Sequence, residues 1–381
     1  MKSRFALVLL TLSAAACSDA PTASLDVDQS PLFGANVASH GTSTVRWNRK
    51  SIALFRARGG NAGRVNAYLG VAQYRAALAA NDAKHGQTRP SLAGAVAAAS
   101  ARVLKQFYSL DVASIDAELA AQRAEPPFGS ERNRDFSAGE AIGDAIGVTV
   151  LALAATDNFG VTNPGTPPVG TGKWISSGAS IVRGGLGARP FFMTSGSELR
   201  RQPPPTFGSA EFLAALTEVR AFSDARTPAQ VAVSQAWVPF SGVVFNGIAN
   251  DLIEKYHRTE LEAARIIGYA NAAAFDAIIA CFDTKFAYWF IRPTQADAGI
   301  TTAVGLPNHP SYPSAHSCES GAFEEILSDA FPDEVDNIAA IAQEANMSRI
   351  IGGLHYRFDG DAGLAIGHEA AQLALTRRGI E

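Results

Sequence analysis

Cysteine is scarce in this sequence, positive charge is not in excess, and long apolar runs are missing beyond the N-terminus. Three cysteines in 381 residues exclude a small fold held together by several disulfides. A formal net charge of −4 excludes the basic surface typical of nucleic-acid-binding proteins, so we expect no nucleic-acid partner. The longest later apolar run, residues 146–155, has half of the roughly 20 residues that a membrane span needs. We therefore expect the folded part to be soluble.

The N-terminus has the pattern of an export signal. Lys2 and Arg4 precede an apolar run over residues 5–12, and alanines at 14–16 precede Cys17. Small residues directly before a cysteine are typical of bacterial lipoproteins, although alanine at position 14 replaces the usual leucine. We interpret residues 1–17 as a lipoprotein-type signal peptide, with ordinary signal cleavage as the alternative. The protein is then exported to the periplasm or cell envelope, and the lipid anchor at Cys17 is its only predicted membrane contact.

The rest of the chain divides into a tether and one domain. Residues 18–45 are rich in Ser, Thr, Ala, Asp and Pro, which predicts a flexible tether that cannot bury a core. Hydrophobic residues make up 47% of the chain, which is enough for a large core, so we expect a single domain over residues 46–381. Cys281 and Cys318 could pair in an oxidising compartment, but two isolated cysteines are more often small buried apolar residues.

Helical periodicity dominates that domain, and the alternation typical of strands is nearly absent. Residues 158–207 differ, because they are rich in Gly, Pro and Ser; we predict a long loop there with a short hairpin, of the kind that often covers a functional site. The sequence therefore predicts an all-α fold of helical bundles. Apolar spacings of three and four predict helices over residues 62–82, 91–107, 137–156, 209–222, 227–237, 243–257, 260–280, 318–330, 333–346 and 361–378.

Unusual polar residues are concentrated in three short segments near the C-terminus. In the first, Lys285 and Arg292 stand seven residues apart. Seven helical residues turn through about 700°, so we expect both side chains on one helix face, about 10 Å apart. Pro293 is predicted to end that helix. Two cations on an otherwise apolar face need an anion or solvent, and taken alone this pair is better explained as a solvated basic edge.

The second segment is the run His-Pro-Ser-Tyr-Pro-Ser-Ala-His over residues 309–316. Ser314 offers a hydroxyl, and His316 can exchange a proton near neutral pH. A predicted helix follows, so these groups would lie at a helix N-terminus, where backbone N–H groups favour an anion. Taken alone, Ser314 is as well explained as a helix cap, and His309 as a turn residue.

The third segment contains Ser348, Arg349, His355 and Asp359. The spacing of four residues lets the Asp359 carboxylate accept a hydrogen bond from the His355 imidazole. Such a bond fixes the tautomer of the imidazole and makes its other nitrogen a better nucleophile or ligand.

Together the segments resemble the site shared by vanadium-dependent haloperoxidases, bacterial class A acid phosphatases and type 2 phosphatidic acid phosphatases. That pattern is Lys-x6-Arg-Pro, Pro-Ser-Gly-His and Ser-Arg-x5-His-x3-Asp, and ten of its eleven specified positions match within residues 280–365. The departure is Ala315, which stands where the family has glycine. The added methyl group, and the aversion of alanine to positive φ, put the fit of the anion in question.

The resemblance implies an all-α fold with the active site at the end of a bundle, and a cage for a tetrahedral oxyanion. Lys285, Arg292 and Arg349 would neutralise the oxygens of vanadate or phosphate. The Ser314 hydroxyl and the Ala315 N–H would add hydrogen bonds.

The resemblance also implies the catalytic roles. His355 would bind the vanadium of vanadate, or attack phosphorus, while Asp359 orients it. His316 would act as general acid and base at the opposite oxygen. His309 occupies the position of a histidine in algal bromoperoxidases, where it would tune the handling of halide or peroxide.

We expect a haloperoxidase, with vanadate as cofactor and with hydrogen peroxide and halide as small-molecule substrates. The alternative is an acid phosphatase that hydrolyses phosphate monoesters through a phosphohistidine at His355. Three features favour the former: the chain is longer than simple acid phosphatases without the membrane spans of lipid phosphatases, His309 is present, and His355-Tyr-Arg-Phe-Asp359 looks like haloperoxidases.

Other classes of protein fit the sequence less well. A metal hydrolase is disfavoured because no His-Glu-x-x-His pattern exists and the three cations would repel a divalent metal ion. A non-catalytic surface lipoprotein would explain the tether but not the motif. A degenerate relative that binds the anion without turnover stays open through Ala315, and the oligomeric state stays open as well.

Overall fold

The computed structural model describes residues 41–83, 88–127, 129–239 and 241–380. The signal peptide, Cys17 and residues 18–40 of the tether lie outside the described residues. The predicted end of the tether at residue 45 is wrong, because helix α1 begins at Ser43. The carboxylate of Glu260 accepts hydrogen bonds from the backbone N–H groups of Ser43 (2.6 Å) and Thr44 (2.8 Å). A carboxylate more than 200 residues away in sequence thus caps this helix.

The regular secondary structure of the described residues is almost all helical, which confirms the predicted all-α class. Strands β1 (Arg89–Pro90) and β2 (Arg134–Asp135) form a two-residue parallel pair, and short 3₁₀ turns occur at Ser109–Asp111, Gly129–Glu131 and Pro332–Glu334. The helices are α1 (Ser43–Arg58), α2 (Ala62–Asp82), α3 (Leu92–Phe107), α4 (Val112–Ala124), α5 (Phe136–Ala155), α6 (Ala210–Ala225), α7 (Pro228–Ala236), α8 (Ser241–Lys255), α9 (Glu260–Tyr288), α10 (Pro293–Ala296), α11 (Ala315–Ala330), α12 (Val335–Ile351) and α13 (Arg357–Arg377).

All ten predicted helices are present, but α1 and α4 are not predicted by apolar periodicity. Half of the residues that α1 buries are polar. Among them, the Asn48 side chain donates hydrogen bonds to Asn246 (2.9 Å) and Asn250 (3.0 Å) of α8. Helix α4 buries only Ile115 and Gln122 among its residues. Neither helix therefore carries the apolar stripe on which the prediction relied.

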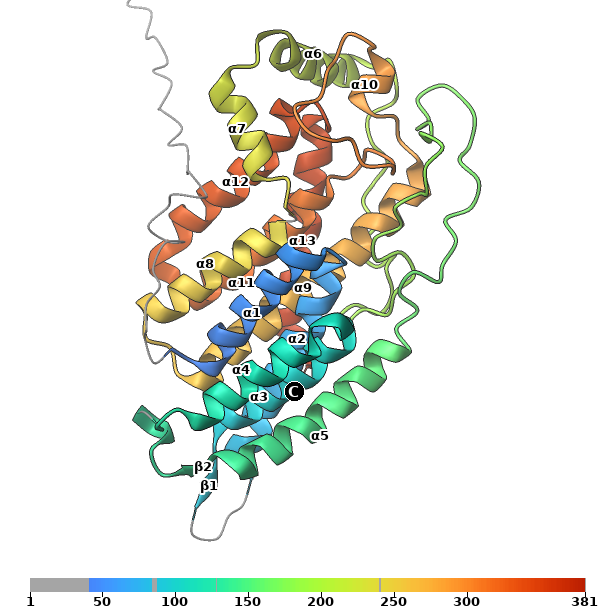
Figure 1. Ribbon diagram of the computed structural model, residues 1–381. Coiled ribbons are helices and arrows are strands. Elements are labelled where there is room, and N and C mark those ends of the chain that lie inside the picture. Colours follow the sequence, from blue (N-terminus) through green and yellow to red (C-terminus); the bar gives the residue numbers. More distant parts are fainter. Residues whose placement is uncertain (1–40, 84–87, 128, 240, 381) are drawn as a thin grey trace, which may run out of the picture.

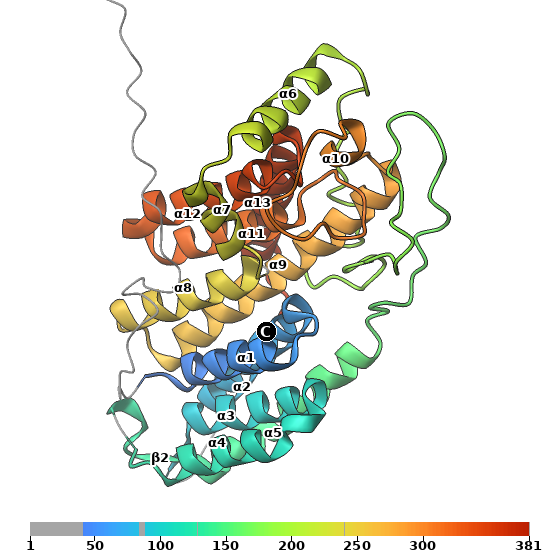
Figure 2. The same ribbon diagram turned by 45° about the horizontal axis from the view of Figure 1, so that its top comes forward.

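Helix α9 runs through the middle of the molecule, with helices on both sides (Figures 1 and 2). Helix α2 packs against one side of α9, and α3 and α5 follow outward from α2. Helices α11 and α13 pack against α9 and against each other, and α12 packs on α11. Helices α6, α7 and α10 gather at one end of the molecule (Figure 1).

Two helices, α5 and α9, are long and apolar enough to cross a membrane by length and composition. A search for unbroken apolar runs does not find them, because both helices contain isolated polar residues. The most apolar window of α9 is 94% buried inside the protein, so α9 is the core helix. The corresponding window of α5 is 28% buried, and α5 lies at the outer edge (Figure 1).

Helix α5 packs so closely on α3 that only glycine fits at the contact. A Cβ atom on Gly143 would lie 2.0 Å from the carbonyl oxygen of Ala95. We expect Gly143→Ala to lower the free energy of unfolding by about 1–3 kcal/mol, because the helix backbones must separate. Thermal unfolding followed by circular dichroism measures this loss. Ala145→Ser, on the exposed face of α5, is the control, and equal unfolding temperatures for the two variants would contradict the close contact.

Residues 158–207 form the predicted long loop, but the predicted hairpin is wrong, since the loop contains only an isolated bridge between Lys173 and Phe290. The loop is held by hydrogen bonds to other segments instead. The buried Asp276 carboxylate of α9 accepts three bonds from the backbone N–H groups of residues 191–193 (2.7–3.1 Å). The N–H of Val182 donates to the carbonyl of Asn308 over 3.0 Å. The loop therefore packs along the segment that carries the second motif.

Candidate active site

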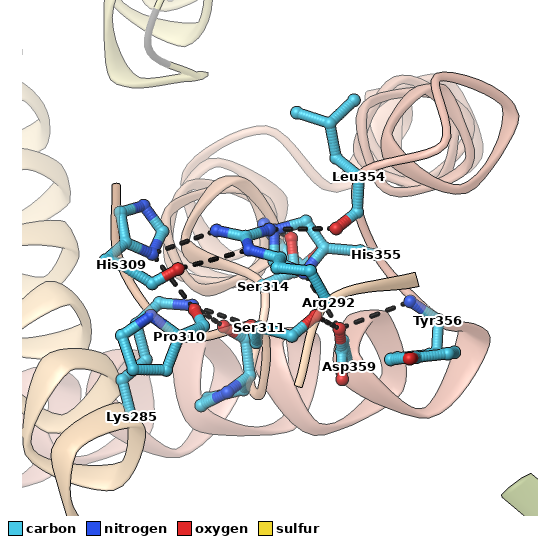
Figure 3. A network of polar contacts seen from close by, with 12 residues as sticks. Lys285, Arg292, His309, Pro310, Ser311, Ser314, Leu354, His355, Tyr356 and Asp359 are labelled. Atoms are coloured by element: carbon cyan, nitrogen blue, oxygen red, sulfur yellow. Dashed lines mark hydrogen bonds and ion pairs between the residues drawn. The ribbon is translucent and has the colours of Figure 1, made fainter. Parts of the chain in front are cut away.

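The three predicted segments converge near the C-terminal end of α9 (Figure 3). They contribute the end of α9, the connection from residue 289 to α11, and the α12–α13 turn. The side chains brought together in one hydrogen-bonded network are Lys285, Arg292, His309, Ser311, His355 and Asp359. All six are buried. This location agrees with the predicted site at the end of a bundle.

The prediction that Lys285 and Arg292 share one helix face is wrong, because α9 ends at Tyr288. Trp289 adopts the left-handed conformation (φ 53°, ψ 43°), and its N–H donates to the Lys285 carbonyl. Arg292 lies in the extended segment that follows, and Pro293 begins α10 instead of ending α9. The two cations still meet, because both donate to the loop over residues 309–313. Lys285 Nζ donates to the carbonyls of Pro310 (3.0 Å), Ser311 (2.7 Å) and Pro313, and Arg292 Nε donates to that of His309 (3.1 Å).

Arg292 bridges two imidazoles at the centre of the network (Figure 3). One Nη atom lies 3.0 Å from His355 Nε2, and the other lies 3.0 Å from His309 Nδ1. A guanidinium has no acceptor, so His355 Nε2 accepts its bond through a lone pair. His309 Nδ1 also lies 3.0 Å from the carbonyl oxygen of Pro310, which can only accept, so Nδ1 forms one of these two hydrogen bonds at a time. Arg292 also donates to the carbonyl of Leu354 over 2.8 Å. The arrangement requires His355 to carry no hydrogen at Nε2.

His355 is oriented from its other side by Asp359, as predicted. Its Nδ1–H donates to Asp359 Oδ2 over 2.9 Å, which leaves Nε2 as the lone-pair nitrogen. Burial, together with the charges of Arg292 and Lys285, lowers the pKa of His355 well below its usual value. His355 therefore presents a neutral, fixed lone pair toward the cations, which suits a ligand or a nucleophile.

The Asp359 carboxyl is fully buried, and its surroundings shift its pKa in both directions. Burial raises its pKa to about 6, while the hydrogen bond from Ser311 and the charges of Lys285 and Arg292 oppose the rise. Ser311 Oγ donates to Asp359 Oδ2 over 2.5 Å. The motif does not predict Ser311 as a site residue. Its position within the run over residues 309–316 was the sequence feature that could have identified it.

Ser314 and Ala315 begin α11 at this site. Ser314 is the N-cap, as the simpler interpretation held, because its Oγ accepts from the N–H of Ser317 over 3.4 Å. Its own N–H donates to the carbonyl of Asp359 over 2.8 Å. Ala315 is the first residue of the helix and has helical backbone, so alanine meets no positive φ there. The backbone of this position therefore tolerates the departure from glycine.

His316 and Arg349 lie beside the network and contact the end of α7 and the residues that follow it. His316 Nε2 donates to the carbonyl of Trp237 (2.8 Å). Arg349 donates to the carbonyl of Ser234 (2.7 Å) and to Ser348 Oγ (2.9 Å). Burial and the charge of Arg349 lower the pKa of His316 to about 3, and His316 in turn lowers the pKa of His355. Residues 234–237 thus hold two predicted site residues, which the sequence analysis does not anticipate.

The site contains more buried positive than negative charge. In the described part of the chain, Lys285, Arg292 and Arg349 form no ion pair with a carboxylate within 4.0 Å, and Asp359 is the carboxylate that acts on Lys285 and Arg292 electrostatically. Burial lowers the pKa of Lys285 to about 8 and the pKa values of both arginines to about 10. Buried cations are costly unless a negative charge accompanies them, so the site is suited to an anion.

Other features of the described residues lie outside this chemistry. Cys281 and Cys318 are free and buried, which agrees with their interpretation as small buried residues. No group of three or more His, Cys, Asp or Glu side chains that could hold a metal ion occurs among the residues the structure describes. A cavity of about 310 Å³ next to Thr259 and Glu260 contains none of the predicted site residues, and it lies at the other end of α9.

Comparisons with known proteins relate this chain to one group of enzymes. No protein-family model matches the sequence. A vanadium-dependent bromoperoxidase from Ascophyllum nodosum is 33% identical over 92 residues, with 16% of either chain covered, so the match spans a small part of that protein.

Solved structures match over most of the chain. A bacterial vanadium-dependent iodoperoxidase superposes with a TM-score of 0.73 at 20% identity, covering 87% of this chain and 95% of the other. A bacterial vanadium-dependent chloroperoxidase in its holo form gives a TM-score of 0.64 at 15% identity, covering 92% and 94%. Its apo form gives 0.63 at 13% identity, covering 82% and 92%. The helical arrangement of this chain is therefore the fold of the vanadium-dependent haloperoxidases.

Proposed function

We propose that this chain is a vanadate-dependent haloperoxidase-like enzyme that uses hydrogen peroxide to oxidise a halide to hypohalous acid. One observation carries the proposal: His355 Nε2, fixed as a lone-pair nitrogen by Asp359, faces the buried guanidinium of Arg292. Such a nitrogen is suited to bind the central atom of an oxyanion whose oxygens the cations hold. The fold shared with solved iodo- and chloroperoxidases supports the same function.

The residues present fit vanadate in charge and in donor type. Lys285, Arg292 and Arg349 are buried cations without a carboxylate ion pair in the described chain, so they would hold its oxygens. Ser314 Oγ accepts from Ser317 N–H, which leaves its own hydroxyl hydrogen for an oxyanion, and Ala315 would add its N–H. Bound vanadate would supply the activation of hydrogen peroxide toward halide.

Binding of an oxyanion requires two residues to exchange partners. Arg292 occupies the lone pair of His355 Nε2, so this bond must break before Nε2 becomes a ligand, and the freed donor can turn to an oxygen. Likewise, His316 must release the Trp237 carbonyl before its Nε2 can give or take a proton. His309 uses Nδ1 for its contacts with Arg292 and with the Pro310 carbonyl, so its Nε2 is the atom we assign to halide or peroxide.

A phosphatase remains the second candidate, because the same His355 lone pair would attack phosphorus in a phosphate monoester. The neutral imidazole held by Asp359 is the specific observation in its favour. His316 would then protonate the leaving alcohol. The solved structures of similar fold are haloperoxidases by name, which favours the first candidate.

Two assays on the chain lacking residues 1–17 distinguish these functions. We expect peroxide-dependent bromination or iodination of a dye that requires vanadate and falls about a thousandfold in His355→Ala. The matched control is His368→Ala, which removes another histidine bonded to a carboxylate, that of Glu324 at 2.9 Å, outside the site. Phosphate ester hydrolysis that vanadate inhibits, without any halogenation, would establish the phosphatase instead. Full halogenation in Arg349→Ala would contradict the cation cage.

We also infer, from the pattern of residues 1–17, that the mature chain is exported and acylated at Cys17. Cells that express the full chain should incorporate labelled palmitate into it, and Cys17→Ala should abolish the label. An unlabelled, secreted wild-type protein would indicate ordinary signal cleavage.

A further inference from the structure

Ser311 forms three hydrogen bonds, which join it to Asp359, Lys285 and Phe290. Its Oγ donates to Asp359 Oδ2 over 2.5 Å, and its carbonyl accepts from Lys285 Nζ over 2.7 Å. Its N–H donates to the carbonyl of Phe290 over 3.0 Å. The side chain is completely buried. Ser311 therefore contacts both the carboxylate that orients His355 and a cation of the proposed cage.

The oxygen to which Ser311 donates is the one that orients His355. Asp359 Oδ2 accepts from Ser311 Oγ, from His355 Nδ1 (2.9 Å) and from the N–H of Tyr356 (3.2 Å). Asp359 Oδ1 is buried and has no hydrogen-bond partner in the described structure. A carboxylate can rotate about its terminal bond, and such a rotation would turn the accepting oxygen away from the imidazole. The short bond from Ser311 opposes this rotation.

We propose that Ser311 is a positioning residue for His355, acting through Asp359. The hydroxyl holds the carboxylate, the carboxylate holds Nδ1–H, and Nε2 is thereby aimed at the oxyanion. Ser311 itself does not contact the reacting atoms. The inference rests on the proposed function in one respect, namely that His355 Nε2 binds the oxyanion.

The serine hydroxyl can be tested separately from the serine backbone. Ser311→Ala removes only the bond to Asp359, because the bonds to Lys285 and Phe290 use backbone atoms. Ser311→Thr retains a hydroxyl. A purely structural role would lower stability without any energetic dependence on Asp359, whereas a positioning role acts only while Asp359 is present.

The experiment is a double-mutant cycle of Ser311→Ala and Asp359→Ala on the chain lacking residues 1–17. Calorimetry measures the dissociation constants of orthovanadate and of inorganic phosphate, and thermal unfolding confirms that each variant is folded. We expect Ser311→Ala to weaken anion binding about tenfold, which is a typical loss when a residue that orients a coordinating side chain is removed. In the Asp359→Ala background the same change should have less than about a twofold effect. Ser311→Thr should remain near the wild type.

The control is Ser100→Ala, which removes another buried hydroxyl, one that donates to the carbonyl of Val96 in α3 over 2.7 Å. It should leave anion affinity unchanged. Equal losses from Ser311→Ala with and without Asp359, or no loss at all, would overturn the positioning role while leaving the proposed function intact. Failure of the wild-type chain to bind either anion would overturn both.

Discussion

Arg292→Ala is expected to weaken the binding of vanadate or inorganic phosphate by about two to three orders of magnitude. The guanidinium is fully buried and donates to His355 Nε2, His309 Nδ1 and two backbone carbonyls. Its removal leaves His355 Nε2 and two backbone carbonyls unpaired and takes one positive charge from the proposed cage. Calorimetric titration of each anion into the variant, compared with wild type, measures the loss.

Two variants separate the geometry of Arg292 from its charge. Arg292→Lys keeps the charge but cannot bridge two imidazoles, since a single ammonium lacks the planar fork of a guanidinium. We expect intermediate affinity, about tenfold below wild type. Arg265→Ala is the control for a general loss of positive charge, because Arg265 lies on α9 away from the site, with its Cζ 5.1 Å from the ring of Tyr269. Wild-type affinity in Arg292→Ala would contradict the assignment of the cage.

The second large effect is a loss of oxyanion affinity as the pH rises above about 8. Burial lowers the pKa of Lys285 to about 8, so the ammonium is charged below this pH and becomes neutral above it. Each proton lost there removes a cation from the cage, and we expect affinity to fall about tenfold between pH 7 and pH 9.5. Molybdate is a suitable probe, because it stays a tetrahedral dianion throughout this range, and its dissociation constant can be measured by calorimetry.

Stability should respond to the same titration with the opposite sign. Since the folded pKa of Lys285 lies below the ordinary value of 10.5, the unfolded chain binds more protons between these two values. The contribution of Lys285 to the stability of the anion-free protein therefore rises with pH over that interval. In Lys285→Met the pH dependence of molybdate affinity should disappear, and affinity should be low at every pH. A variant that kept the wild-type pH profile would assign the titration to another group.

The sequence predicted which residues form the candidate site better than it predicted how they come together. The His355–Asp359 hydrogen bond follows from a spacing of four residues, because both residues lie in one turn of chain. Lys285 and Arg292 were assigned to one helix, yet the chain turns at Trp289 into a left-handed conformation. The hydrophobic pattern does not predict that turn, because apolar and aromatic residues stand on both sides of it.

Contacts between distant segments were not accessible from the sequence. Ser311 could not be told from Ser314, although the structure places one on the Asp359 carboxylate and the other at a helix cap. The carbonyls of Ser234 and Trp237, which hold Arg349 and His316, belong to a segment without any motif. Backbone acceptors leave no signature in side-chain chemistry, and only the packing of α7 on α12 brings them to the site.

The helical class and most helix positions could be predicted from the sequence, because hydrophobic periodicity is a local property. The candidate cations could be named from the family motif, because residue type and spacing are local as well. Three features became visible only in the folded chain: Arg292 lies between His309 and His355, the 309–313 loop holds Lys285, and alanine at 315 has helical backbone. These outcomes depend on where a helix ends and which backbone carbonyls approach from other elements. Such properties arise from the packing of the whole chain and not from any one segment.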